Sequence, residues 1–273
     1  MPRSRVIIKN IDVSLQRAHT AFDGVRIAHA SDLHLSRWNR TLRDAQATLM
    51  HAEFDVLCVT GDFGTFRRVW KRSADLTREF FDPIANRRPI YAVLGNHDHP
   101  GIAREASPPL TFLRNTWTKV TVGASNFFLV GVDPLDFHLS ELMADLPSNR
   151  TVPTLMLAHY PSTVFQLPAG NVDLMLSGHT HGGQIRIPYL GCLWANDRIP
   201  RRMARGLHCL PMATLHVSPG IGRSLPIPLR INCPPEITIL TLRTVENSPL
   251  HAPVTGPTRS LRAQSERAIP AKI

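Results

Sequence analysis

The segment VRIAHASDLH at residues 25–34 contains the pattern that decides the fold. It begins with an apolar run of strand length and ends in an Asp-x-His triplet. The segment DVLCVTGD at residues 55–62 has the same form and ends in Gly-Asp. Between them, residues 41–54 place apolar side chains at helical spacing. A buried strand, an amphipathic helix and a second buried strand predict an α/β domain with right-handed crossovers.

Further apolar runs extend this prediction along the chain. A second amphipathic helix is expected at residues 70–85, and alternation at residues 5–15 predicts an outer strand. After Gly182 the chain becomes rich in Pro and Gly, which indicates β-rich structure with many loops. The other expected strands are residues 25–30, 55–60, 89–95, 126–132, 154–159, 172–178, 185–191, 214–220, 227–232 and 236–242.

Length and composition bound the domain organisation. The chain has 273 residues, 43% of them hydrophobic, which is enough for one large domain with a sizeable core. From residue 245 the sequence is rich in Pro, Ser and Arg and poor in large apolar residues. We therefore expect one folded domain over residues 1–244 and a disordered tail over residues 245–273.

The chain is basic, but its charge is dispersed. Lys and Arg number 31 against 21 Asp and Glu, for a formal net charge of +10. The basic residues fall into separate groups at 67–72, 198–205 and in the tail, and no RNA-binding or zinc-finger pattern accompanies them. This distribution argues against nucleic acid as a partner.

The cellular compartment is predicted from the targeting and membrane-spanning signals that are not seen in the sequence. No apolar run approaches the ~18–20 residues needed to cross a bilayer, and the first residues have no apolar core of a secretory signal. The four cysteines form no CxxC pair, which argues against a zinc ribbon and favours reduced thiols, with Cys58 in the core. We expect a cytoplasmic protein that can attach peripherally to the inner membrane.

Polar residues of the kinds that bind metals follow the expected strands. Open α/β sheets place their sites at these carboxyl ends, and a mixture of carboxylate, imidazole and amide oxygen suits Mn, Fe or Zn better than Ca. Two divalent metal ions side by side can activate a hydroxide and clamp the attacking and leaving oxygens of a phosphoryl group, and a site of that kind needs residues of these types. The candidates are Asp32 and His34, Asp62, Asn96 with His97 and Asp98, His159, and His179 with His181.

The order of these motifs, DxH, GD, GNHD, H and GHTH, resembles the calcineurin-like metallophosphoesterase superfamily over residues 25–218. More narrowly, SDLHL, GNHD, SGHTHGGQI and the later SPGIGRSLPIPLRINCPPEITILTL are similar to the bacterial phosphodiesterase subgroup typified by YkuE and YaeI. The resemblance implies an α/β fold in which two packed mixed β-sheets are flanked by helices, an αββα sandwich, with a dinuclear site at the strand ends.

The resemblance also implies a role for each candidate. Asp62 would bridge the two metals, and His97 would face the phosphoryl group and protonate the leaving oxygen. Asp98 would orient the His97 imidazole. The first metal would be held by Asp32, His34 and His181, and the second by Asn96, His159 and His179.

The expected reaction is hydrolysis of a phosphodiester or pyrophosphate bond by a metal-bridging hydroxide. Residues 182–206 are amphipathic and basic. They either dock on an anionic membrane and admit a lipid-linked substrate, or form a partly buried loop. Some relatives hydrolyse UDP-2,3-diacylglucosamine in lipid A biosynthesis, which gives an alternative substrate.

Two functions of other kinds compete with this prediction. A non-catalytic metal-binding scaffold of the same fold usually loses a ligand or the catalytic histidine, whereas every position is filled here. A nucleic-acid phosphodiesterase would account for the charge, but the dispersed basic residues argue against it. His29, inside the first strand, is expected to pack in the core or behind the ligands rather than to bind metal.

Overall fold

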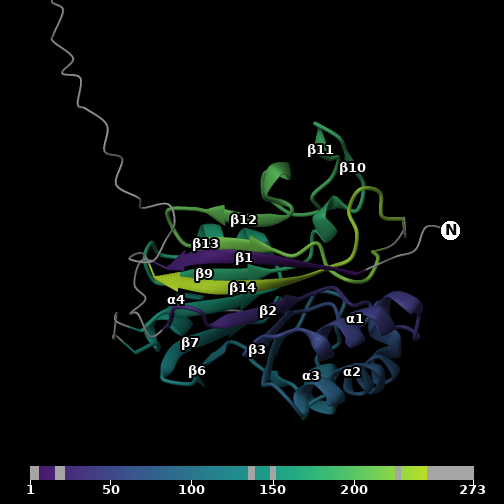
Figure 1. The fold of residues 1–273 in the computed structure, drawn as a ribbon, viewed down its shortest axis with the longest axis horizontal. Helices are drawn as coiled ribbons and strands as arrows, with labels where there is room; N and C mark the ends of the chain where they lie inside the picture. The colour runs from purple at the N-terminus through teal and green to yellow at the C-terminus, as the bar shows by residue number, and fades with distance from the viewer. Residues whose placement is uncertain (1–5, 16–21, 135–138, 148–151, 225–228, 245–273) are drawn as a thin grey trace, which may run out of the picture.

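Two mixed β-sheets packed face to face form the centre of the protein (Figure 1). The computed structural model describes residues 6–15, 22–134, 139–147, 152–224 and 229–244. Over these residues each of the two sheets has six strands, and helices cover their outer faces. The predicted αββα sandwich is confirmed.

The first sheet has the strand order β1-β14-β2-β3-β4-β5. Strands β2 to β5 run parallel, β14 runs antiparallel to β2, and β1 pairs parallel with β14. The outer strand predicted at residues 5–15 is therefore found, at the edge of this sheet. The strands are β1 Ile7–Leu15, β2 Arg26–Ala30, β3 Val56–Thr60, β4 Ile90–Val93, β5 Thr111–Phe112 and β14 Glu236–Thr244.

The second sheet has the order β12-β13-β9-β8-β7-β6. Its four central strands are parallel, and β12 and β6 are antiparallel edges. A separate two-stranded hairpin, β10–β11, projects from the top of the molecule in Figure 1. The strands are β6 Thr116–Val122, β7 Ser125–Val132, β8 Thr154–Ala158, β9 Leu174–Ser177, β10 Arg186–Ile187, β11 Gly191–Cys192, β12 Gly206–Cys209 and β13 Thr214–Val217.

Helices lie where the periodicity predicts them. Asn39 caps the first helix, because its side chain accepts a hydrogen bond from the Leu42 amide at 3.0 Å. The second helix has the predicted bounds, residues 70–85. The helices are α1 Arg40–His51, α2 Trp70–Ala85, α3 Gly101–Glu105 and α4 Leu139–Ala144, and the short 3₁₀ turns are η2 Arg67–Val69, η3 Pro161–Gln166, η4 His181–Gly183 and η5 Arg201–Met203.

Three apolar clusters hold the layers together. One lies between the two sheets and joins side chains such as Ile27 and Val56 to Leu155 and Leu174. A second packs α1 and α2 on the first sheet, and a third covers the outer face of the second sheet. Cys58 of β3 is buried in the cluster between the sheets, as predicted. This packing fixes the strand ends that carry the site.

Two expected strands differ from the structure. The stretch 185–191 is not one strand, because it holds β10 and the start of β11, which pair as a hairpin. The expected strand at 227–232 is wrong for its described part: residues 229–232 form a loop with one isolated bridge, Ile185 to Ile231. The reason is Arg230, whose side chain is drawn inward and donates to the carbonyls of Pro219 and Gly222. The expected disordered tail, residues 245–273, lies outside the described residues. Within the described part of the chain, no helix is both long and apolar enough to cross a membrane.

Candidate active site

The predicted polar residues meet at one edge of the sandwich, in the loops that follow β2, β3, β4, β8 and β9. The loops are tied to each other by their backbones: the Asp32 amide donates to the Gly61 carbonyl at 2.9 Å, and the His34 amide donates to the Asp62 carbonyl at 3.0 Å. Left-handed backbone angles, which cost energy for residues with a side chain, occur at Asp32, His34, Asp62, His179 and His181. Such strain gathered at one place is typical of a functional site.

Four of these residues form a compact buried cluster. Asp32, His34, Asp62 and His181 each offer a ligand atom, and these atoms all lie within 4.8 Å of one another. Nε2 of His34 lies 3.1 Å from Nε2 of His181, which in turn lies 3.5 Å from Oδ1 of Asp32. All four residues are buried.

A second group adjoins the first. Oδ1 of Asn96 lies 2.9 Å from Nε2 of His159, and Nε2 of His159 lies 3.5 Å from Oδ1 of Asp62. The Nδ1 of His159 contacts the Thr60 carbonyl at 2.7 Å. A carbonyl oxygen only accepts, so Nδ1 of His159 carries a proton, and Nε2 is the ring nitrogen that faces Asn96.

Asp62 faces both groups with different oxygens. Its Oδ2 lies 3.6 Å from Nε2 of His34, and its Oδ1 lies 3.5 Å from Nε2 of His159. The carboxylate is held by the backbone amide of His97, which donates to Oδ1 at 2.9 Å. A side chain so placed has the geometry to bridge two cations.

His179 lies beside the second group. Its ring centroid is 5.0 Å from that of His159, and its Nε2 donates to the Asn196 carbonyl at 2.7 Å. That bond leaves Nδ1 as the lone-pair nitrogen. A backbone carbonyl bonded to the second nitrogen is the usual way in which proteins orient a metal-binding imidazole. The His179 amide also donates to the Asp32 carboxylate at 3.1 Å, which links the two groups.

The donor set fits divalent cations. Burial raises the pKa of Asp32 and of Asp62 to about 7 in the metal-free protein, because each ionised carboxylate would be shielded from water. Burial also lowers the pKa of His34 and of His179 to about 3, so these rings stay neutral, the form that binds metal. Lone pairs of imidazole, carboxylate and amide oxygen that point at each other favour a cation between them.

His97 stands next to these groups without joining either of them. Its half-buried ring lies 5.3 Å from the His34 ring, centroid to centroid, and its Nδ1 contacts the Thr65 carbonyl at 3.2 Å. The Nδ1 therefore carries a proton, and Nε2 is the nitrogen available to a substrate.

The predicted pairing of Asp98 with His97 is not found. The described hydrogen bonds of the buried Asp98 carboxylate run to backbone amides: Oδ1 accepts from Gly64 at 2.9 Å and Oδ2 from Gly95 at 2.8 Å. Asp98 thus ties the loop after β3 to the loop after β4. The Thr65 carbonyl takes the place beside the imidazole that the sequence prediction gave to Asp98.

Two glycines permit the close approach of these loops. A side chain at Gly95 would overlap the Asp62 carboxylate, and one at Gly178 would overlap Ser31 and Asp32. Any larger residue at either position would push a carboxylate out of the cluster.

Other participants were not identified from sequence. The carbonyls of Thr60, Thr65 and Asn196 orient imidazoles, but a backbone atom leaves no mark in a sequence pattern. His29 is buried behind the site, as predicted, with Nε2 2.9 Å from the Thr60 hydroxyl. Its Nδ1 lies 2.8 Å from Nδ1 of His216, a residue that stands in no motif.

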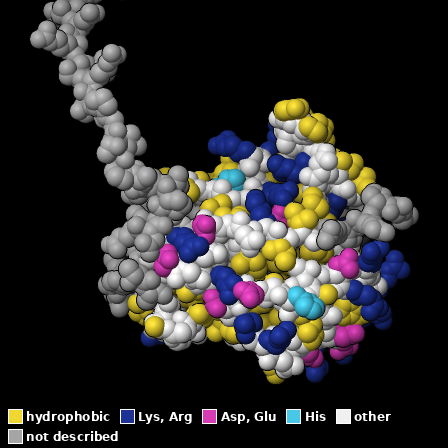
Figure 2. Space-filling model, viewed as in Figure 1, with side chains coloured by type: hydrophobic (Ala, Val, Ile, Leu, Met, Phe, Trp, Pro, Cys, Tyr) yellow, Lys and Arg dark blue, Asp and Glu magenta, His cyan; other side chains and the backbone are white. Residues whose placement is uncertain are grey.

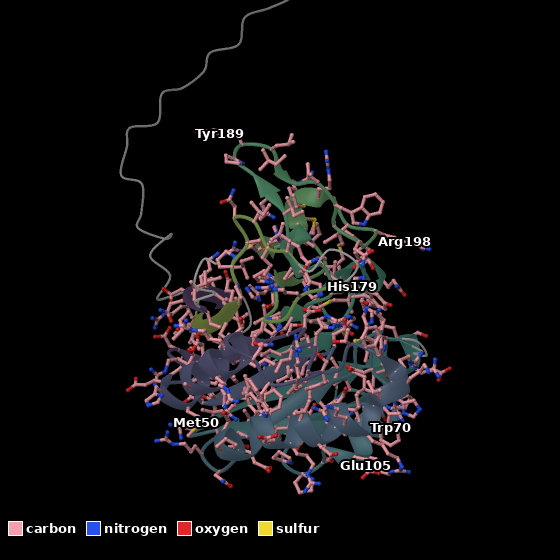
Figure 3. All side chains as sticks on the ribbon, turned by 90° about the vertical axis from the view of Figure 1, so that its right-hand side faces the viewer. Met50, Trp70, Glu105, His179, Tyr189 and Arg198 are labelled. Atoms are coloured by element: carbon pink, nitrogen blue, oxygen red, sulfur yellow. The ribbon has the colours of Figure 1, made fainter. Side chains whose placement is uncertain are left out.

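Two hollows open beside the ligands. The larger, about 980 Å³, has His179, Tyr160, Phe165 and Trp194 among its lining residues. The smaller, about 350 Å³, is lined by His179 and His181, by polar side chains such as Gln184, and by apolar side chains such as Ile185 and Trp194. Figure 3 shows His179 and Arg198 on this side of the molecule, with Tyr189 at its outer tip. Buried carboxylates and imidazoles gathered at strand ends are ligands of the kind that metal-dependent hydrolases use.

Comparison with known proteins identifies the class of hydrolase. Residues 25–183 match the family described as calcineurin-like phosphoesterase. The chain is 32% identical over 227 residues to phosphodiesterase YaeI of Escherichia coli strain K12, which covers 80% of this chain and 82% of the relative. The chain belongs to the calcineurin-like phosphoesterase family, and it is a phosphoesterase.

Two further relatives match most of the chain, and one of them is named for its substrate. The metallophosphoesterase YkuE of Bacillus subtilis strain 168 is 28% identical, with 82% of this chain and 80% of the relative covered. The UDP-2,3-diacylglucosamine pyrophosphatase LpxG of Chlamydia muridarum is 25% identical, with 85% of this chain and 88% of the relative covered.

Proposed function

We propose that this protein is a dinuclear metal-dependent phosphodiesterase or pyrophosphatase. The observation that carries the proposal is the position of Asp62, whose two oxygens face separate groups of ligands. The first cation would be held by Asp32, His34 and His181, the second by Asn96, His159 and His179, and Asp62 would contact both. Mn, Fe and Zn all suit this donor set.

The protein's own residues would position the reaction. When bound, two divalent cations stabilise charge on phosphoryl oxygens and lower the pKa of water for attack on phosphorus. The strained, hydrogen-bonded loops hold the ligands rigidly, so little reorganisation is needed as the reaction proceeds. His97, with its Nδ1 proton on the Thr65 carbonyl, would deliver a second proton from Nε2 to the leaving oxygen.

The proposed substrate is a lipid-linked phosphodiester or pyrophosphate. Support comes from the surface around the β10–β11 hairpin, where large apolar side chains are exposed. Tyr189 is fully exposed, and Leu190 and Trp194 are 59% and 73% exposed. Figure 2 shows hydrophobic side chains at the tip of this hairpin, with Lys and Arg side chains below them.

This surface has the composition of a membrane-docking site. Exposed aromatic and aliphatic side chains enter the headgroup region, while nearby arginines attract anionic lipid. Arg198, Arg201 and Arg202 are exposed on the same segment. The segment is also partly buried, as the other expectation for residues 182–206 had it: Cys192, Ile199 and Met203 belong to the apolar cluster on the second sheet. Docking would account for the side chains of the segment that stay exposed.

Docking is tested with vesicles. We expect the protein to sediment with vesicles that contain phosphatidylglycerol and to remain unbound with pure phosphatidylcholine. A Tyr189→Ser/Leu190→Ser variant should lose most of this binding, whereas Ile8→Ser, on the edge strand β1 outside the hairpin, should not. Equal sedimentation of all three proteins would contradict docking by the hairpin.

UDP-2,3-diacylglucosamine is a second candidate substrate, because the LpxG relative is named for it. A panel of substrates separates the candidates. Protein loaded with Mn would be assayed on bis-p-nitrophenyl phosphate, p-nitrophenyl phosphate, UDP-2,3-diacylglucosamine and phospholipids, with and without detergent. We expect diesters to be hydrolysed faster than the monoester. No turnover of any substrate by fully metal-loaded protein would contradict the proposed activity and favour a scaffold.

A further inference from the structure

A third hollow, of about 460 Å³, lies at the β10–β11 hairpin. Its volume is within the usual range for ligand pockets, about 300–1,000 Å³. Three arginines line it, Arg186, Arg201 and Arg202, and its wall is mostly polar. Among the described residues, no Asp or Glu lines this hollow. Three like charges without a carboxylate beside them repel one another, so an anion bound between them would be stabilised.

Backbone contacts hold two of the three guanidinium groups. Nη1 of Arg186 donates to the Gly182 carbonyl at 3.0 Å, and Nη1 of Arg201 donates to the Leu193 carbonyl at 3.5 Å. A guanidinium has five N–H donors, so both groups keep donors for a ligand. Two N–H groups of one guanidinium can bind two oxygens of one phosphate, which makes arginine the side chain best suited to this anion.

The apolar tip of the hairpin borders the same hollow. Tyr189 and Leu190 line it beside the arginines, and they are fully exposed and 59% exposed. Figure 3 shows Tyr189 at the outer tip of the molecule. A free phosphate in the hollow would leave both side chains in water. A phospholipid would cover them, because its phosphate lies at the depth where such side chains enter a bilayer. The hollow therefore favours a phosphate that is carried by a lipid.

The hollow adjoins the proposed active site without being part of it. Neither His97 nor any proposed metal ligand lines it. Arg201 lines both this hollow and the 980 Å³ hollow, which reaches His179. A lipid phosphate bound at Arg201 would hold the 980 Å³ hollow close to the bilayer surface.

We propose that the hollow lined by Arg186, Arg201 and Arg202 binds the phosphate of an anionic phospholipid headgroup. The bound lipid is an anchor and not the substrate, because its phosphate lies away from the metal ligands. The inference goes beyond general attraction of the hairpin to an anionic surface, since it assigns a defined site for one headgroup. It does not depend on the proposed reaction.

Replacement of arginine by lysine separates a phosphate site from general attraction. Arg201→Lys/Arg202→Lys keeps the net charge and removes the planar groups that bind two phosphate oxygens at once. Arg198→Lys is the matched control, because Arg198 is exposed on the same segment and does not line this hollow. On vesicles that contain phosphatidylglycerol, we expect the double variant to bind about tenfold more weakly, the equivalent of one charge-assisted hydrogen bond, and the control to bind like the unmodified protein. Equal binding of all three proteins would overturn the inference, and docking through the apolar tip would still stand.

Calorimetric titration identifies the source of the phosphate. Metal-loaded protein would be titrated with dihexanoylphosphatidylglycerol below its micellar concentration, and separately with inorganic phosphate. The binding that Arg201→Lys/Arg202→Lys loses is assigned to the hollow. We expect this binding to be tighter for the lipid than for inorganic phosphate. Equal or tighter binding of inorganic phosphate would overturn the assignment to a lipid. Lipid binding of this kind in a protein that hydrolyses no substrate would support the inference and contradict only the proposed function.

Discussion

Replacement of His97 by glutamine is expected to slow turnover while both proposed metal sites stay filled. The ring is 5.3 Å from the His34 ring, close enough to reach a substrate at the ligands without being one of them. The bond that steadies Asp62 comes from the His97 backbone amide, at 2.9 Å, and survives any change of side chain. Metal content of the variant should therefore equal that of the unmodified protein.

The expected loss follows from the protons on the ring. With Nδ1 bonded to the Thr65 carbonyl, the imidazole donates from Nε2 only when it carries both protons. Loss of a general acid typically costs ~10²–10⁴-fold in rate. The loss should be largest for a diester whose leaving group is a poor one, such as an alkoxide, and smallest for p-nitrophenolate, which departs without a proton.

The assay compares kcat for two diesters of different leaving-group basicity, together with elemental analysis of bound metal. If His97→Gln loses metal, His97 is a ligand and the assignment is wrong. If metal is kept and both diesters slow equally, the side chain stabilises charge on the phosphoryl oxygens and does not protonate the leaving group.

Four further predictions test the site and its support. Asp62→Ala should lose metal from both sites, measured by elemental analysis; near-full occupancy would refute the bridging role. Asp98→Ala should lower both stability and metal affinity, because it removes the hydrogen bonds that join two loops. Thermal unfolding and metal titration measure these effects. If the variant changes only the pH profile of catalysis, Asp98 acts on His97 as the sequence predicts. Arg205→Ala should cost about 3–5 kcal/mol in urea unfolding, since it leaves Glu236 buried and unpaired; a cost near zero would show that the ion pair is dispensable. Metal-free protein should gain thermal stability as pH rises from about 4 toward about 6.5. Burial lowers the pKa of five histidine rings, to about 3 for His29, His34 and His179 and well below the usual value for His181 and His216. Over this range the unfolded state therefore binds more protons on these rings than the folded state keeps on Asp32, Asp62 and Asp98, whose pKa burial raises to about 7; thermal unfolding measured across the range checks this, and a fall in stability would contradict it.

The pattern of residues predicts an α/β domain and the composition of the site, and the family resemblance adds the two packed sheets. Apolar runs mark strands that are buried on both faces, such as β3 and β8, because parallel strands in a layered sandwich meet no water. Since polar residues follow several of these strands, their meeting at one sheet edge follows from topology. Asp32, His34, Asp62 and His181 meet for that reason.

Other features depend on three-dimensional contacts that leave no pattern. The carbonyls that orient His97, His159 and His179 belong to backbone, so no residue type reveals them. The sequence predicts that Asp98 orients the neighbouring His97 imidazole. In the structure the Asp98 carboxylate instead accepts hydrogen bonds from backbone amides of two loops. Arg230 stands in an alternating apolar run typical of a strand, but its side chain binds carbonyls inside the protein and keeps the segment a loop.

The central claim, that Asp62 lies between two cations, is tested most directly by anomalous X-ray diffraction from crystals grown with Mn. The account predicts two anomalous peaks ~3.5–4 Å apart. One should be bounded by Asp32, His34 and His181, the other by Asn96, His159 and His179, with a different Asp62 oxygen on each. A single peak, or two peaks of which one is not in contact with Asp62, would contradict the account.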